Sequence, residues 1–220
     1  TRTALEGLYV AGEDAGGAHG SNRLGGNGVA NSTVYGGVAG DTMGADIRKM
    51  GALRDPCPTT LQAEIDRAMH PLTRKPDLVQ PLRHALQEAM WENVGVLRTE
   101  TGLTRAQTRV DDISTALMEV GVAPDNLAFN LTWHDWLNLR SLCDISQAIA
   151  LAGLERENSR GAHYREDFPD EGDLDASYFT VVTQTGQDLA VRRDPVDFSI
   201  VRPGETILPD GEPETLVAAQ

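Results

Sequence analysis

The chain has 220 residues, of which 40% are hydrophobic and 24% are charged, enough for one or two packed domains. Its formal net charge of −14 argues against a nucleic-acid partner, because a phosphate backbone needs clustered Lys and Arg. No apolar run approaches the ~20 residues that span a bilayer, so no direct membrane insertion is expected. Cys57 and Cys143 lie far apart without zinc-ligand spacing, which predicts two reduced thiols and no metal site.

The N-terminal segment predicts a strand, a glycine-rich loop and a helix start. Residues 8–11 have a short buried-strand pattern that ends at Gly12 and Glu13. A strand-end carboxylate followed by glycines can accept hydrogen bonds from sugar or ribityl hydroxyls. Asn27 and Gly28 are expected to open a helix, whose unpaired N–H groups and dipole favour negative charge. The segment therefore predicts a site for an anionic cofactor.

Helical periodicity dominates the middle of the chain, after a proline-bracketed linker expected at residues 54–58. Three apolar stripes recur at three- and four-residue spacing. They are Leu82, Ala85, Leu86, Ala89 and Met90; then Val110, Ile113, Leu117 and Val120; then Leu139, Leu142, Ile145, Ile149 and Ala152. Residues 104–107 and 132–135 are expected to cap the second and third helices. Because these stripes can be buried only against each other, a three-helix bundle is predicted.

Strand composition returns near the C-terminus. Residues 178–183 and 196–201 are rich in β-branched and aromatic side chains, and Gly186 before residues 187–191 is a hairpin signal. A small antiparallel hairpin or meander is predicted. From Arg202 the proline- and glycine-rich sequence predicts an extended tail.

Two motifs of this sequence resemble motifs of the succinate dehydrogenase/fumarate reductase flavoprotein family and occur in the same order. In the first motif, residues 19–27, HGSNRLGGN, resemble the family's HGANRLGGN, and the preceding residues 7–13, GLYVAGE, resemble its GLYAAGE. The second motif, residues 159–169, SRGAHYREDFP, is similar to the SRGAHxRxDFP segment that closes the helical domain of these flavoproteins and, in looser form, of L-aspartate oxidases.

The resemblance implies the C-terminal portion of such a flavoprotein subunit. The family's subunit is far longer, and this sequence has no strand followed by GxGxxG, the fingerprint that binds the ADP half of FAD. The expected fold is mainly α with small β parts. The end of an FAD-binding α/β domain would occupy residues 1–55, a helical bundle residues 56–160, and the SRGAH loop, β-hairpin and tail residues 161–220.

The same resemblance implies which residues contact FAD. Glu13 matches a family glutamate that contacts the cofactor; the alternative is a carboxylate that accepts hydrogen bonds from loop N–H groups. Asn27, Gly28 and Val29 match the helix N-terminus that meets the flavin, where the dipole can stabilise charge on the reduced ring. Many relatives have Ser and Leu at the last two positions, so backbone contacts are expected here rather than a side-chain hydrogen bond.

Arg23 and His19 are the expected substrate contacts. The family's arginine at the position of Arg23 binds a substrate carboxylate, and a planar guanidinium fork suits this bidentate contact. The alternative is an arginine that pairs with an acid of this chain. His19 is expected either to hydrogen-bond near the substrate or to brace the loop. The loop before it is one residue shorter than in membrane-complex members, which leaves the identity of the dicarboxylate open.

Arg160, His163, Arg165 and Asp167 form the charged part of the second motif. They are expected to lock the helical bundle onto the flavin domain through charge-assisted hydrogen bonds. The alternative is a surface that meets an electron-transfer partner. The family's FAD-attachment histidine, capping domain and proton-donating arginine would lie upstream, so no catalytic residue is assigned in this chain.

The function implied is an FAD-dependent oxidoreductase that interconverts succinate and fumarate, or a close dicarboxylate, by hydride transfer to or from flavin N5. Its expected partners are an N-terminal FAD-binding half and an iron–sulfur subunit, with a cytoplasmic location at the inner face of the membrane through that complex. The alternatives are an L-aspartate oxidase-like enzyme and a non-catalytic helical docking or assembly module. The chain alone is expected neither to retain FAD tightly nor to turn over, because most dinucleotide contacts belong to the N-terminal fold.

Overall fold

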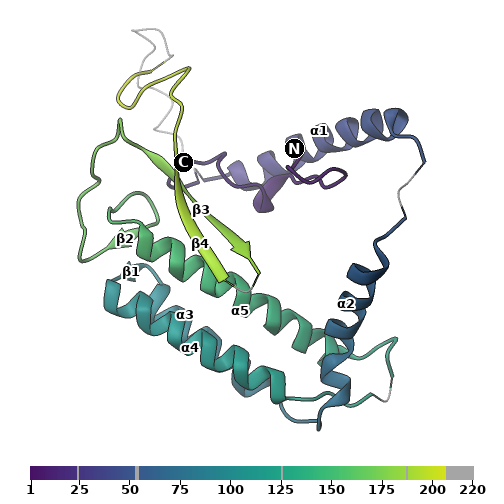
Figure 1. Ribbon diagram of the computed structural model, residues 1–220. Helices are drawn as coiled ribbons and strands as arrows, with labels where there is room; N and C mark the ends of the chain where they lie inside the picture. Colours follow the sequence, from purple (N-terminus) through teal and green to yellow (C-terminus); the bar gives the residue numbers. More distant parts are fainter. Residues whose placement is uncertain (24, 53–54, 125, 187, 207–220) are drawn as a thin grey trace.

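The computed structural model describes residues 1–206 except residues 24, 53–54, 125 and 187 (Figure 1). The fold is mainly helical with small β parts, as predicted. Its elements in chain order are η1 (Gly12–Asp14), α1 (Asn27–Lys49), α2 (Pro58–Met69), η2 (His70–Thr73), α3 (Gln80–Val94), β1 (Leu97–Arg98), α4 (Glu100–Glu119), α5 (Leu131–Glu155), β2 (Tyr164–Arg165), β3 (Tyr178–Thr185) and β4 (Asp188–Pro195). None of the described helices is long and apolar enough to cross a membrane.

The predicted three-helix bundle is confirmed. Helices α3, α4 and α5 lie side by side and bury two hydrophobic clusters (Figure 1). The larger cluster comprises Val79, Leu86, Val110, Ile113, Leu117, Val122, Trp136, Leu139 and Cys143. The smaller comprises Val94, Leu103, Ala106 and Ala150. The Trp136 Nε1 donates to the carbonyl oxygens of Leu117 and Val120, both at 3.0 Å, so the largest core side chain leaves no buried donor unpaired.

The stripe predicted on the third helix is correct at Leu139, which is buried, and wrong for most of the rest. Leu142 and Ile149 are exposed, and Ile145 is 58% exposed. Helix α5 instead buries a neighbouring stripe that shares Leu139 with the predicted one; it comprises Trp136, Leu139, Cys143, Ser146, Ala150 and Gly153. A Cβ on Gly153 would lie 3.3 Å from Leu103 Cδ2, which indicates that α4 approaches closely here. Close approach of two helices favours small side chains, so this stripe faces the core although the other is more hydrophobic.

Both predicted helix caps are wrong in position. Helix α4 starts a turn earlier, where the Thr99 side chain accepts a hydrogen bond from the Gly102 N–H at 3.1 Å. Helix α5 starts at the Asn130 cap, whose Oδ1 accepts from the Trp133 N–H at 3.0 Å. Residues 104–107 and 132–135 therefore lie inside helices, where a pattern such as T-x-x-Q has no capping role.

The expected strand at residues 8–11 is wrong. The described N-terminal residues form only an isolated antiparallel bridge between Arg2 and Tyr9, and the Val10 N–H donates to the Thr1 carbonyl at 2.8 Å. A parallel strand needs neighbouring strands to pair its backbone groups, and the described residues of this chain offer none here. The helix expected to open at Asn27 is confirmed as α1, which lies apart from the bundle (Figure 1).

The hairpin prediction is confirmed for β3 and β4, which pair antiparallel around Gly186. The third strand of the alternative meander, at residues 196–201, does not form: Val196 ends the pairing by donating to the Ser177 carbonyl at 2.9 Å. The short parallel pair β1–β2 has no counterpart in the sequence prediction. In the expected linker, residues 55–57 are irregular and Pro58 already opens α2. Residue 54 and most of the expected tail lie outside the described residues.

Candidate functional site

The glycine-rich segment folds back onto the first two turns of α1. Gly12 has φ +81°, and a Cβ there would lie 2.8 Å from Ser32 Oγ, so the η1 backbone packs directly on the helix. Ser32 in turn donates to the Gly28 carbonyl at 2.9 Å. Glu13 follows in η1 with an exposed side chain. The first motif therefore approaches α1 at its N-terminal end.

His19 is held against the same helix. Its Nε2 lies 3.0 Å from the Asn31 Nδ2, and with the amide as donor the imidazole proton sits on Nδ1. The two side chains line a cavity of about 310 Å³, to which Asn27 and Tyr35 also contribute. The geometry braces the loop and leaves Nδ1 as a donor for a ligand.

Arg23 lies over the start of α1. A Cβ on Gly28 would be 3.0 Å from Arg23 Nη1, so the glycine makes room for the guanidinium. Arg23 is exposed and forms no ion pair with any other described residue. The N-cap Gly26 provides no side-chain hydrogen bond, and the first turn contains no acid. Guanidinium and uncapped N–H groups together create a positive potential suited to an anion.

The predicted cofactor and substrate residues thus gather at one end of α1. His19 and Arg23 contact this end through Asn31 and Gly28, and Asn27 opens the helix. Val29 lies on its surface and is 79% exposed.

Arg165 and Asp167 join the ends of two bundle helices. Arg165 is 1% exposed and binds both oxygens of Asp167, at 2.7 and 2.8 Å. Its Nη1 donates to the carbonyls of Gly153 and Leu154 at 3.0 Å, near the C-terminus of α5. Asp167 accepts from the Glu100 N–H at 2.7 Å, at the N-terminus of α4. The pair therefore places each charge at the helix end that its dipole favours.

The electrostatics of this pair follow from those contacts. The two hydrogen bonds from Arg165 are the main cause that holds the pKa of Asp167 at about 2. Asp167 is therefore ionised at neutral pH.

His163 and Arg160 complete the second motif. Arg98 donates to the His163 Nδ1 at 2.7 Å, and His163 Nε2 lies 3.3 Å from the Arg156 carbonyl. Burial lowers the pKa of His163, and the nearby arginines lower it further, which favours the neutral imidazole. Arg160 donates to the Glu171 carbonyl at 2.6 Å and to two further oxygens of residues 173 and 177. The hydrogen-bond partners of His163 and Arg160 thus lie in the bundle and in the loop that follows it.

The two motifs meet although they lie far apart in the sequence, at residues 19–27 and 159–169. The Ala162 N–H donates to the Ser21 carbonyl at 3.3 Å. A cavity of about 640 Å³ lies at this junction, between Gly20, His163 and the hairpin residues Tyr178 and Phe179. Sequence reasoning missed Arg98 and Arg156, because single arginines outside the motifs carry no spacing signal.

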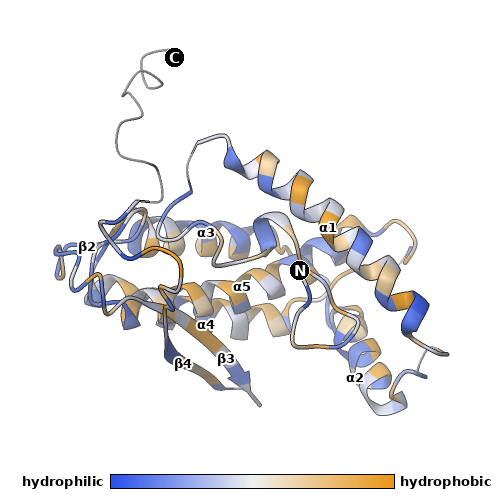
Figure 2. Cartoon of the chain, turned by 90° about the horizontal axis from the view of Figure 1, so that it is seen from above, coloured by the Kyte–Doolittle hydropathy of each residue, from blue (hydrophilic) through white to orange (hydrophobic). Residues whose placement is uncertain are grey.

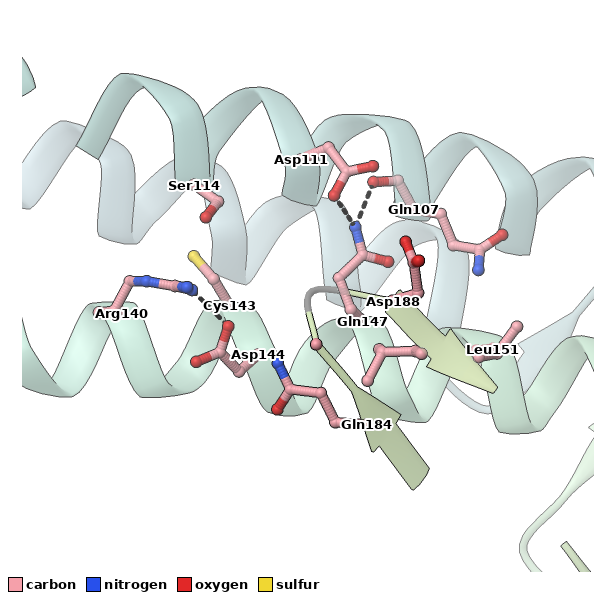
Figure 3. Close-up of a pocket in the computed structure, with 12 residues that line it drawn as sticks. Gln107, Asp111, Ser114, Arg140, Cys143, Asp144, Gln147, Leu151, Gln184 and Asp188 are labelled. Atoms are coloured by element: carbon pink, nitrogen blue, oxygen red, sulfur yellow. Dashed lines mark hydrogen bonds and ion pairs between the residues drawn. The ribbon is translucent and has the colours of Figure 1, made fainter. Parts of the chain in front are cut away.

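Another groove, of about 590 Å³, lies between α4, α5 and the hairpin turn (Figure 3). None of the predicted site residues lines it. Some of its polar side chains bind each other: Gln147 donates to Asp111 at 2.5 Å and to the Gln107 carbonyl, and Arg140 pairs with Asp144. Ser114, Gln184 and Asp188 also line the groove.

Known proteins are similar to this chain in sequence. The family model described as fumarate reductase flavoprotein C-term matches residues 83–208. A fumarate reductase (CoM/CoB) chain of Methanothermobacter marburgensis is 34% identical over 77% of this chain and 30% of its own length. The succinate dehydrogenase flavoprotein subunit of Coxiella burnetii is 30% identical over 83% of this chain and 31% of its own. L-aspartate oxidase of Yersinia pestis is 31% identical over 77% and 30%.

A solved structure has the same fold as this chain. Mycobacterium smegmatis Sdh1, in complex with UQ1, superimposes with a TM-score of 0.80 at 28% identity and covers 87% of this chain and 33% of its own. The chain thus spans roughly a third of the relatives it matches, a share typical of one domain of a larger subunit. It belongs to the fumarate reductase/succinate dehydrogenase flavoprotein family, in the C-terminal part of that flavoprotein.

Proposed function

We propose that this chain forms the C-terminal part of an FAD-dependent oxidoreductase that interconverts succinate and fumarate or a close dicarboxylate. An FAD-binding part with the dinucleotide fold would complete it. Family membership supports this, as do relatives named fumarate reductase and succinate dehydrogenase flavoprotein subunits. Residues 1–55 would complete the FAD-binding domain, residues 56–160 form the helical domain, and residues 161–220 join the two.

The observation that carries the proposal is the position of Arg23 over the uncapped first turn of α1. A free guanidinium beside unpaired N–H groups is suited to hold one carboxylate of a dicarboxylate by a bidentate contact. His19, fixed by Asn31, would donate from Nδ1 to the same substrate. In this arrangement the chain binds and orients the substrate, and the groups that move protons belong to the FAD-binding part.

The residues at this end of α1 also fit FAD. The first turn lacks an acid and a side-chain cap, so its N–H groups are available to the flavin. The exposed carboxylate of Glu13 is suited to accept hydrogen bonds from ribityl hydroxyls. When bound, FAD supplies the hydride chemistry at flavin N5. Asn27, Gly28 and Val29 would contribute backbone N–H groups and the helix dipole.

The proposed partners follow from the relatives. The solved Sdh1 structure contains UQ1, which supports an electron path toward a membrane quinone through an iron–sulfur subunit. The chain would then work at the cytoplasmic face of the membrane. L-aspartate oxidase is the second candidate, since one such relative is 31% identical over 77% of the chain. L-aspartate is also a dicarboxylate, so Arg23 would keep its role.

The test is Arg23→Lys in the chain assembled with its FAD-binding part. Lysine keeps the charge and loses the planar fork of the guanidinium. The variant is therefore expected to lose about 2–4 kcal/mol of transition-state stabilisation, measured as a fall in kcat/KM for succinate or fumarate. Arg48→Lys is the matched control, because Arg48 also lies beside a glycine, Gly44, at the other end of α1. Unchanged turnover in the Arg23 variant would exclude it from the site. If the unmodified protein oxidises L-aspartate but not succinate, the second candidate is favoured. If it turns over neither substrate, the non-catalytic docking module is favoured.

A further inference from the structure

We infer that Gly161 is a positioning residue for Arg23. The turn at residues 160–163 holds the backbone of Ser21, two residues before Arg23, and so sets where the guanidinium lies over Gly28. The inference rests on the proposed function, because it assigns to Arg23 the contact with a substrate carboxylate.

The turn is a fixed platform on the helical bundle. Arg160 and His163 exchange two backbone hydrogen bonds, at 2.8 and 3.0 Å. The Arg160 side chain then donates to the Glu171 carbonyl at 2.6 Å, to Ser177 Oγ at 2.7 Å and to the Asp173 carbonyl at 2.9 Å. A turn tied at both its backbone and its side chain moves little when a neighbour is displaced.

Gly161 brings this platform into backbone contact with the first motif. Its φ is +56°, and a Cβ there would lie 2.5 Å from the Ser21 oxygen, 2.7 Å from the Ser21 carbonyl carbon and 2.9 Å from the Asn22 Cβ. Two of these atoms belong to backbone, which cannot rotate aside as a long side chain can. The next residue, Ala162, donates its N–H to the same Ser21 oxygen at 3.3 Å. Only glycine permits this close approach.

The loop that carries Arg23 has few other anchors. Ser21, Asn22 and Arg23 are exposed, and none of the three forms a side-chain hydrogen bond with another described residue. Upstream, the loop is held at His19 by Asn31. A side chain at position 161 would therefore displace the loop, not the platform. A misplacement of about 1 Å in a binding group can reduce its effect by as much as 10²-fold.

The experiment is a double-mutant cycle between Gly161→Ala and Arg23→Lys in the chain assembled with its FAD-binding part. The readout is the dissociation constant of malonate, a dicarboxylate that cannot be dehydrogenated because it has one carbon between its carboxylates. Gly161→Ala is expected to weaken malonate binding about tenfold when Arg23 is present and much less when it is combined with Arg23→Lys, because the two changes remove the same contact.

Gly172→Ala is the matched control. Gly172 lies in the same loop and has φ +71°, so alanine brings similar backbone strain, but its Cβ would meet only the Arg160 Nη2 and the Asn158 Cβ, both at 3.8 Å. This variant is expected to lower the thermal midpoint through backbone strain alone and to leave malonate binding unchanged. Equal loss of malonate binding in the two alanine variants would overturn the inference.

Two further results separate the possible failures. If the unmodified protein does not bind malonate, the proposed function fails and the inference with it. If Arg23→Lys weakens malonate binding but Gly161→Ala acts additively with it, the proposed function stands and the inference is overturned. If Gly161→Ala does not fold, Arg160→Gln replaces it in the cycle, because this change loosens the turn without adding a Cβ. If the Arg160→Gln variant binds malonate as tightly as the unmodified protein does, the inference is likewise overturned.

Discussion

The helical bundle and the N-terminal region differ in what holds them together. The bundle encloses side chains such as Val110, Leu117 and Leu139, none of them accessible to solvent. In residues 1–50, residue 24 apart, only Gly12 and Ala39 are buried. Figure 2 shows hydrophobic residues along α1 nonetheless, and several of them are exposed. The bundle therefore has a core of its own, whereas the region proposed to bind substrate depends on contacts to other parts of the structure.

The largest expected effect comes from emptying the bundle core. Trp136→Ala is expected to lower the free energy of unfolding by about 3–5 kcal/mol, because it removes a fully buried ring and two hydrogen bonds. Trp91→Ala is the control on α3; Trp91 is 83% exposed, so its loss should stay within about 0.5 kcal/mol. Urea denaturation of the 220-residue chain measures both. Similar losses would refute the position of the core.

A smaller effect is expected at the charged pair that joins α4 and α5. Asp167→Asn keeps the shape of the side chain but leaves the buried Arg165 without its carboxylate, which should cost about 1–3 kcal/mol of unfolding free energy. Asp194→Asn is the matched control, because Arg192 and Asp194 form the same bidentate pair at the same spacing on an exposed strand. No measurable change is expected there. An equal loss at both would mean that burial adds nothing to the pair.

The same pair predicts a pH dependence. The pKa of Asp167 is about 2 in the folded chain, below the ~3.9 of an unfolded aspartate. A depressed pKa adds stability above the unfolded value, and that stability is lost as the pH falls from about 4 through about 2. The difference in unfolding free energy between the unmodified chain and Asp167→Asn should therefore narrow over this range. A constant difference would show that the ionised carboxylate contributes nothing.

The smallest effect is expected on α1. Ile47 is 67% exposed, so Ile47→Ala should change the unfolding free energy by less than about 0.5 kcal/mol. Ile113→Ala is the matched change in α4, where isoleucine is buried and a loss of about 2–5 kcal/mol is expected. Denaturation curves of the two variants compare the regions directly. A large loss at Ile47 would show that α1 packs in solution against a surface that the described contacts omit.

Periodicity predicted that three helices pack together, because each carries an apolar stripe that must be buried. It did not predict which face of α5 is inside. Leu142, Ile145 and Ile149 have helical spacing, but so do Ser146 and Ala150, and only the close approach of α4 decides between them. Tertiary packing therefore overrode the more hydrophobic stripe.

The motifs predicted the site residues by resemblance, and the sequence alone could not predict how they are held. Asp167 binds the start of α4, and Ala162 binds Ser21, both through contacts between segments far apart in the chain. Such pairs leave no local pattern. The strand expected at residues 8–11 failed for the converse reason, since its local pattern is correct for a sheet whose other strands the described residues do not contain.

The two cysteines differ in burial, so one of them can report on the opening of the bundle. Cys57 is exposed at the start of α2, and hydrogen bonds to Thr59 and Thr60 lower its thiol pKa to about 6. Cys143 lies in the bundle core, where burial raises its pKa to about 11. At neutral pH a thiol reagent should label Cys57 in the folded chain at once. It should reach Cys143 only when the bundle opens, so the rate of the second labelling event measures that opening without any introduced probe.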